Sequence, residues 1–180
     1  TLLLNMILQD IENNEGVAVL DPHGELIDEV VCRIPEHRIR DIIYINFEDT
    51  ENPIPINMLE CRTELEKDLV VQQLFEIFDR LYDLRQTGGP MFEMYMKNAL
   101  YLLLEDQESV ATILEVPKVF ADKDFRDHKI SKAKNREIID FWQKIAEKAS
   151  GEQGLSNWTP YIISKLSMFI YNNTVRNIIA

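Results

Sequence analysis

Apolar residues recur at intervals of three and four through most of this chain, but two short runs before residue 60 break that rhythm. The first run is Val17-Ala18-Val19-Leu20, and the second is Ile42-Ile43-Tyr44-Ile45. Both runs are short, rich in β-branched side chains and bounded by polar or turn-forming residues, which is typical of buried strands. The pattern therefore predicts two neighbouring strands in the first third of the chain.

The segments around these runs predict helices and loops. Apolar side chains cover most of the circumference of residues 1–14, as expected of a helix buried between layers. A second helix is predicted over residues 26–34 and is closed by Pro35. Residues 52–57 hold two prolines and predict an extended crossing loop. A helix, a short turn and a buried strand form the second half of a βαβ unit, so we expect an α/β portion over residues 1–60.

From residue 64 onward the only periodicity is helical, and no strand-like alternation appears. Each predicted helix has one apolar face, and the four faces are Leu65, Leu69, Leu74, Phe78 and Leu81; Met91, Tyr95, Ala99, Leu102 and Leu103; Ile138, Phe141, Trp142 and Ile145; and Ile162, Leu166, Phe169 and Ile170. A short helix over Ser109–Glu115 is expected to be broken by Pro117. We therefore expect a predominantly helical α/β chain, with a helical subdomain over residues 61–172 and a return toward the sheet over residues 173–180.

The net charge of the chain limits the classes of partner that it is expected to bind. Its 180 residues carry a formal net charge of -12, which argues against a free-standing nucleic-acid-binding domain, because such domains depend on clustered lysine and arginine. The one locally basic stretch is residues 122–136. It is either a solvated connector or a loop that contacts nucleic-acid phosphates.

The sequence also bears on location. No apolar run approaches the length needed to span a bilayer, and no signal peptide is present, so we predict a cytoplasmic segment without membrane contact. The two cysteines lack the spacing of metal ligands and are predicted to be free, buried thiols of a reducing compartment. The chain begins at Thr1, which indicates a piece of a longer protein, either soluble or membrane-associated.

Three polar side chains gather in the turn that follows the first predicted strand. The turn reads Asp21-Pro22-His23-Gly24-Glu25. Pro22 cannot donate to a ladder, so Asp21 is expected at the carboxyl end of the strand, where open α/β sheets place their ligands. Gly24 permits a tight turn, and a helix can begin near Glu25. The turn is either part of a nucleotide site or a cap for the following helix.

The order of short motifs along the chain resembles the HerA/FtsK superfamily of P-loop ATPases, and within it the type IV secretion and conjugative DNA-transfer coupling proteins. The motifs that carry the resemblance, beyond Thr1-Leu2-Leu3-Leu4-Asn5 and Gly16–Leu26, are Ile42–Asn46, Pro55-Ile56-Asn57-Met58-Leu59, Gly89-Pro90 with Lys97-Asn98-Ala99-Leu100, Leu114-Glu115-Val116-Pro117, Phe141-Trp142 and Val175-Arg176-Asn177-Ile178-Ile179. The likeness spans nearly the whole chain. It implies a fragment of a RecA-like sheet, between the Walker A and Walker B motifs, with a large helical subdomain.

The resemblance also implies roles for individual residues. A Gly-rich phosphate loop would end at or just before Thr1, which makes Thr1 either its last hydroxyl or the residue after it, in a parent that binds ATP and Mg²⁺. Glu25 and Asp21 are candidates to orient or deprotonate the attacking water, and His23 to sense the phosphate. Arg176 is either an arginine finger toward a neighbouring subunit or a salt-bridging residue.

Two functions follow as hypotheses. The first is a segment of an ATP-driven DNA translocase or secretion-coupling motor, whose parent acts on DNA and assembles as a ring, expected to be a hexamer. The segment alone is expected not to hydrolyse ATP, because it lacks the phosphate loop and the metal-binding carboxylate. The alternative is a helical interaction module that recruits a secretion substrate or accessory protein.

Overall fold

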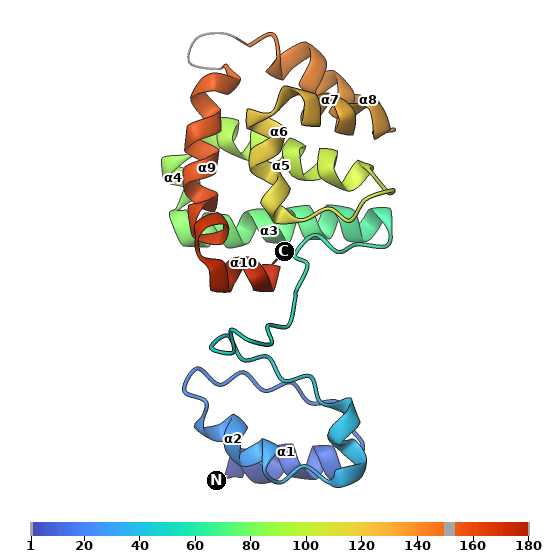
Figure 1. Cartoon of the computed structure of the whole chain (residues 1–180), viewed down its shortest axis with the longest axis vertical. Helices are drawn as coiled ribbons and strands as arrows, with labels where there is room; N and C mark the ends of the chain where they lie inside the picture. The colour runs from blue at the N-terminus through green and yellow to red at the C-terminus, as the bar shows by residue number, and fades with distance from the viewer. Residues whose placement is uncertain (1, 150–153, 180) are drawn as a thin grey trace. The chain divides into compact units, whose positions relative to one another are not determined.

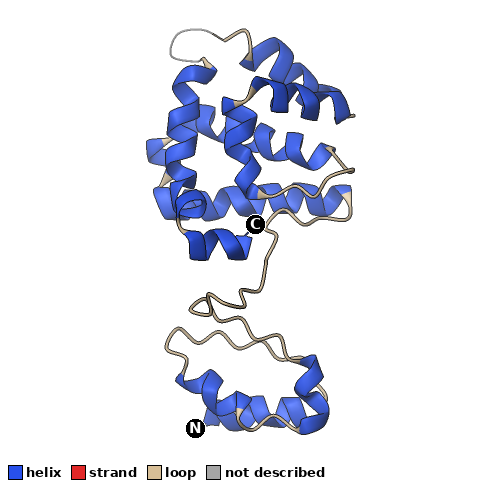
Figure 2. Ribbon diagram, in the orientation of Figure 1, coloured by secondary structure: helices blue, strands red, loops and turns tan. Residues whose placement is uncertain are grey.

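The computed structural model describes residues 2–149 and 154–179, and within them every regular element is a helix (Figure 2). In chain order the elements are α1 (Leu2–Glu12), α2 (Glu25–Val31), η1 (Glu36–Asp41), α3 (Glu64–Tyr82), α4 (Leu84–Thr87), α5 (Gly89–Glu105), η2 (Ile113–Glu115), α6 (Val116–Ala121), α7 (Lys123–Lys132), α8 (Arg136–Asp140), the π-helical η3 (Phe141–Ala146), α9 (Leu155–Tyr171) and α10 (Asn173–Ile179).

The predicted α/β fold, a fragment of a RecA-like sheet, is therefore wrong for the described residues. The runs at 17–20 and 42–45 are non-helical chain that forms no ladder. Most of their apolar side chains face solvent, with Leu20 at 92% exposure and Ile43 at 80%, and Val19 is only partly buried. A strand is stable only when a neighbouring strand satisfies its backbone groups and covers its apolar face. Neither run has such a neighbour, so neither forms a strand despite its β-branched residues.

The chain divides into two compact units, residues 1–45 and residues 46–180. In the first unit, α1 packs on α2, and the small core consists of Leu4, Ile7 and Val30. The Arg38 guanidinium donates to the carbonyl oxygen of Ile11 at 2.7 Å and so ties η1 to the end of α1. Residues 46–60, which the sequence groups with the first portion, belong to the second unit.

The second unit is a helical bundle built around α5 (Figure 1). This helix packs against α3, α4, α6, α7, α8 and α9, and nine of its residues are buried. Of the apolar face predicted for this helix, Tyr95, Ala99, Leu102 and Leu103 are fully buried, and Met91 is partly buried against the core. Pro90 lies in the first turn of α5, where a proline lacks no hydrogen bond that the helix needs.

The apolar face predicted for α3 is divided in the structure. Leu74 and Phe78 are buried in the core, whereas Leu65, Leu69 and Leu81 are exposed. Leu65 and Leu74 are nine residues apart, which is half a turn out of phase at 3.6 residues per turn, so they point to opposite sides. Similarly, Ile145 is exposed while Phe141 and Trp142 are buried.

Two further local predictions are corrected. The helix expected over Ser109–Glu115 is only the single turn η2, and Pro117 lies in the first turn of α6 instead of ending a helix. Both cysteines are free as predicted, but Cys32 is exposed and only Cys61 is partly buried. Across the described residues, no helix combines the length and the apolar character that crossing a membrane requires.

Candidate functional site

The turn that the sequence marked as a site is built by Asp21, which caps α2. One carboxylate oxygen of Asp21 accepts the backbone N–H of His23 at 3.0 Å, and the other accepts those of Leu26 at 2.8 Å and Ile27 at 3.4 Å. Gly24 precedes the helix at φ +84°, the left-handed region that glycine enters without strain, and this bend brings the carboxylate to the helix end. The carboxylate replaces the side-chain cap that Gly24 cannot provide.

These bonds define the charge state of Asp21. The His23 backbone N–H, followed by those of Leu26 and Ile27, holds the pKa of Asp21 below its usual value, because the amides stabilise the ionised form. Its lone pairs are directed at α2. Asp21 is therefore the capping residue of α2 in this geometry, which is one of the two alternatives predicted for this turn.

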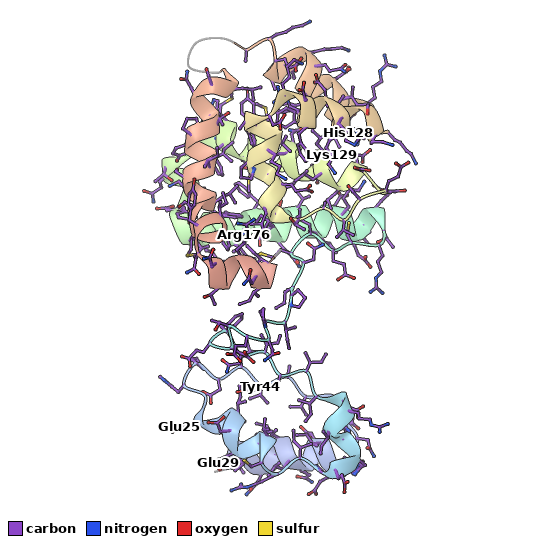
Figure 3. The ribbon with its side chains drawn as sticks, in the orientation of Figure 1. Glu25, Glu29, Tyr44, His128, Lys129 and Arg176 are labelled. Carbon is purple, nitrogen blue, oxygen red and sulfur yellow. The ribbon has the colours of Figure 1, made fainter. Side chains whose placement is uncertain are left out.

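Glu25 and His23 are arranged differently. Both side chains are exposed, and neither makes a recorded hydrogen bond or ion pair within the described residues. Figure 3 shows Glu25 at the start of α2 and Glu29 one turn later on the same helix. Of the three predicted site residues, only Asp21 therefore has side-chain hydrogen bonds within the turn, whereas the Glu25 carboxylate and the His23 imidazole face solvent.

We expect Asp21→Ala to loosen the start of α2 selectively. The variant removes the acceptor for the Leu26 and Ile27 amides, so their hydrogen-exchange protection should fall several-fold. Glu25→Gln serves as the control, since Glu25 accepts none of these bonds, and it should leave that protection unchanged. Equal loss of protection in the two variants would contradict the assignment of the cap to Asp21.

No group of three or more histidine, cysteine or acidic side chains that could hold a metal occurs in the part of the chain that the structure describes. Both carboxylate oxygens of Asp21 accept backbone amides. Thr1, the predicted cofactor-binding residue, lies outside the described residues.

The basic stretch at residues 122–136 is largely neutralised by internal contacts. Four of its seven basic residues are ion-paired, and their partners are Asp127 and Glu147 for Lys123, Glu147 for Arg126, Asp106 for Lys129, and Glu108 for Lys132. Arg126 and Lys129 are also buried. A surface that binds phosphates needs exposed, uncompensated cations. Most of the stretch is helix α7 (Lys123–Lys132), which packs on α5 and α6, so it is not a solvated connector, and its paired cations do not favour a loop that contacts nucleic acid.

Sequence reasoning missed a buried ionic cluster at the carboxyl end of α5. Lys67 from α3 donates to Glu105 at 2.8 Å. Burial disfavours the charged form of Glu105, but Lys67 and the backbone amides of Asn135 and Lys134 outweigh it and lower its pKa. A glutamate on the buried face of an otherwise apolar helix was the signal that could have indicated this cluster.

The adjacent Asp106 makes the second buried pair. Its carboxylate accepts from Lys129 Nζ at 2.9 Å and from Ser109 Oγ at 2.8 Å, and both charged side chains are 4% exposed. Lys129, and then Ser109, lowers the pKa of Asp106 to about 2. Lys129 Nζ also lies 2.6 Å from Ser109 Oγ, a spacing seen in serine–lysine nucleophile pairs. The lysine is bound to a carboxylate here, so it serves as an ion-pair partner and not as a free base.

Two pockets of the helical unit are lined in part by polar side chains. The first has a volume of about 400 Å³ and lies beside Cys61, Lys67 and Ser109. The second, of about 620 Å³, lies beside Lys97 and Tyr101. Lys97 donates to Glu93 at 2.6 Å and to Gln72 at 2.9 Å, and the Tyr101 hydroxyl donates to Asp68 at 3.1 Å. Lys67, Ser109, Lys97 and Tyr101 have partners within the protein, so we assign no ligand to either pocket.

Arg176 lies on α10, and its side chain is exposed (Figure 3). No ion pair of Arg176 is recorded among the described residues, so the salt-bridge alternative has no partner within them.

Comparison with protein-family models, with curated proteins and with solved structures finds no match to this chain. The resemblance to the HerA/FtsK superfamily therefore rests on the residues quoted for it and stays a prediction.

Proposed function

We propose that this chain is a segment of a cytoplasmic ATP-driven motor that moves DNA, of the HerA/FtsK superfamily and the secretion-coupling type. In this proposal ATP and Mg²⁺ are bound chiefly by residues elsewhere in the parent protein, with Thr1 at or just after the end of the phosphate loop. The segment contributes the helical unit and the turn that presents Glu25.

The observation that carries the proposal is that separated pieces of the family-like motif order meet in the fold. The backbone N–H of Ile56 donates to the carbonyl oxygen of Ile178 at 2.5 Å, which joins the motifs at 55–59 and 175–179. The Trp142 indole N–H donates to the carbonyl oxygen of Asn98 at 3.2 Å, which joins the motifs at 97–100 and 141–142. Residues that contact one another have a physical reason to occur together, and this supports the interpretation of the motifs as one family pattern.

Asn57 shows how such a motif residue acts. Its side-chain amide donates to the carbonyl oxygen of Ala111 at 3.0 Å, and its side-chain oxygen accepts the backbone N–H of Leu59 at 3.0 Å. Leu59 is 2% exposed and belongs to the main core. The Pro-Ile-Asn-Met-Leu segment therefore anchors residues 55–59 to the helical unit.

The first test concerns the reading frame that encodes the chain. The proposal expects a Gly-Lys-Ser or Gly-Lys-Thr loop that ends at or just before Thr1 and, after Ala180, an apolar segment that ends in Asp-Glu. Finding neither would discard the proposal. The chain by itself is expected to show no magnesium-dependent ATP turnover.

The second test is Glu25→Gln in the parent protein. We expect this variant to lower ATP turnover about 100-fold or more with little change in nucleotide affinity, because the Glu25 carboxylate accepts a proton from the attacking water. The matched control is Glu29→Gln, since Glu29 lies one turn along α2 in an exposed ion pair with Arg33. If the two variants lose the same activity, Glu25 has no special role.

A second candidate function has its own support. The unit of residues 46–180 has a self-contained core, and its basic stretch is largely paired, so an interaction module for a basic secretion substrate or accessory protein is consistent with it. In this function the chain binds a basic ligand without nucleotide, which fluorescence anisotropy would detect. Binding of nucleotide alone would argue for the motor function instead.

A further inference from the structure

The outer face of α3 carries an apolar stripe that the bundle does not use. Leu69 lies four residues after Leu65, and Ile77 lies eight residues after Leu69; their exposures are 71% for Leu65, 50% for Leu69 and 41% for Ile77. Single exposed apolar residues are common on protein surfaces, but an aligned set along one helix is typical of a face that binds another helix. We call these three residues the α3 stripe.

The inward face of the same helix is already occupied. Val71, Leu74, Phe75 and Phe78 are buried, and α3 packs through them against α5 and α4. The α3 stripe therefore is not an extension of the core, since it lies on the opposite side of the helix. Burying it requires a partner that lies along the helix over about three turns.

The charges of α3 indicate the chemistry of that partner. The helix carries five carboxylates, Glu64, Glu66, Asp68, Glu76 and Asp79, against the exposed Arg80 and the buried Lys67. Glu76 lies seven residues, or two turns, after Leu69, so it shares the face of the α3 stripe. Glu66 follows Leu65 directly and is exposed. A partner with lysine or arginine beside its apolar residues would match this face.

We propose that the α3 stripe is the docking surface for a basic amphipathic helix of a partner protein. This deepens the interaction-module function proposed above, because it names the surface and the class of ligand. The apolar side chains of the partner helix cover the α3 stripe, and its cations lie next to Glu66 and Glu76. A second copy of this chain fits less well, because two α3 helices would bring acidic flanks together.

The probe is a synthetic helical peptide of about 18 residues with leucines at spacings of three and four and lysines on both flanks. Binding to the whole chain is measured by fluorescence anisotropy at about 0.15 M salt. The same peptide with glutamate in place of lysine is the charge control and is expected not to bind. Amide chemical-shift changes are expected to map to α3.

Paired variants locate the surface. Leu69→Gln combined with Ile77→Gln should weaken peptide binding about tenfold or more, whereas Met168→Gln, at a comparably exposed site on α9, should leave it unchanged. Glu76→Lys should weaken binding and reduce its dependence on salt. The exposed positions should leave the circular dichroism spectrum unchanged, which separates lost docking from lost folding.

Several results would overturn the inference. Equal binding by the wild type and the Leu69→Gln, Ile77→Gln variant would exclude the α3 stripe, as would shifts confined to another face. Dimerisation of the chain that the same variant abolishes would assign the stripe to a second copy. None of these results depends on whether a phosphate loop precedes Thr1, so the motor proposal is tested separately.

Discussion

Removing either member of the Asp106–Lys129 pair, by Asp106→Ala or Lys129→Met, is expected to destabilise the helical unit by about 3–5 kcal/mol. The two charges lie 2.9 Å apart, and each side chain is 4% exposed. Truncating one of them leaves the other buried without its counter-charge, which costs far more than the pair itself contributes. Asp106 follows α5 and Lys129 lies on α7, so the contact between these helices should loosen first. Chemical denaturation followed by circular dichroism measures the loss.

The exposed neighbouring pair provides the control. Lys132 and Glu108 lie 2.6 Å apart, but Glu108 is 76% exposed, so Glu108→Gln should cost less than about 1 kcal/mol. A double variant in which Asp106 and Lys129 are both replaced by apolar residues should recover part of the loss, since no charge is left unpaired. If Asp106→Ala lowers the free energy of unfolding by no more than Glu108→Gln does, the prediction that an unpaired buried charge is costly is wrong.

Acid should weaken the same contact. The pKa of Asp106 is lowered from 3.8 to about 2, chiefly by Lys129. A lowered folded-state pKa means that the ionised form is more stable in the folded protein, so its contribution is present above the unfolded pKa and is lost as the pH falls toward the folded pKa. The free energy of unfolding should therefore decrease between about pH 4 and pH 2. The Asp106→Ala variant should lack this part of the decrease.

Trp142→Ala is expected to cost about 3–5 kcal/mol, comparable to the loss of the buried charge. Trp142 is fully buried and packs edge-on against Phe120, with ring centroids 5.6 Å apart, and against Phe141 at 5.2 Å. Its indole N–H donates to the carbonyl oxygen of Asn98 in the central helix α5. The variant leaves a cavity and removes one hydrogen bond to α5.

Two comparisons separate these contributions. Trp142→Phe keeps much of the ring volume but removes the donor, so it should cost less than Trp142→Ala and still exceed about 1 kcal/mol. Tyr171→Ala removes an aromatic ring that is 74% exposed and should stay within about 0.5 kcal/mol of the wild type. Thermal unfolding of the four proteins compares them directly. A small loss for Trp142→Ala would indicate that the η3 segment is not part of the cooperative core.

The sequence predicted some features of the candidate site and missed others. The Asp-Pro-His-Gly-Glu pattern correctly marked a turn that starts a helix, because proline, glycine and a capping carboxylate act over a few residues. It did not indicate that Asp21 rather than Glu25 would cap α2, since this depends on how far the chain reverses at Gly24. The Lys67–Glu105 and Lys129–Asp106 pairs were out of reach, because their members are 38 and 23 residues apart.

The sequence by itself determined that the chain from residue 64 onward is built from helices and that Tyr95, Ala99, Leu102 and Leu103 are core, because a 3.6-residue period is a local property. Only the tertiary structure decided whether the β-branched runs at 17–20 and 42–45 are strands. Each strand needs a neighbour to satisfy its backbone and cover its apolar side chains, and composition does not supply one. The same reason applies to α3, which has apolar residues on both sides. Its packing on α5 and α4 made one side the core and left the α3 stripe exposed.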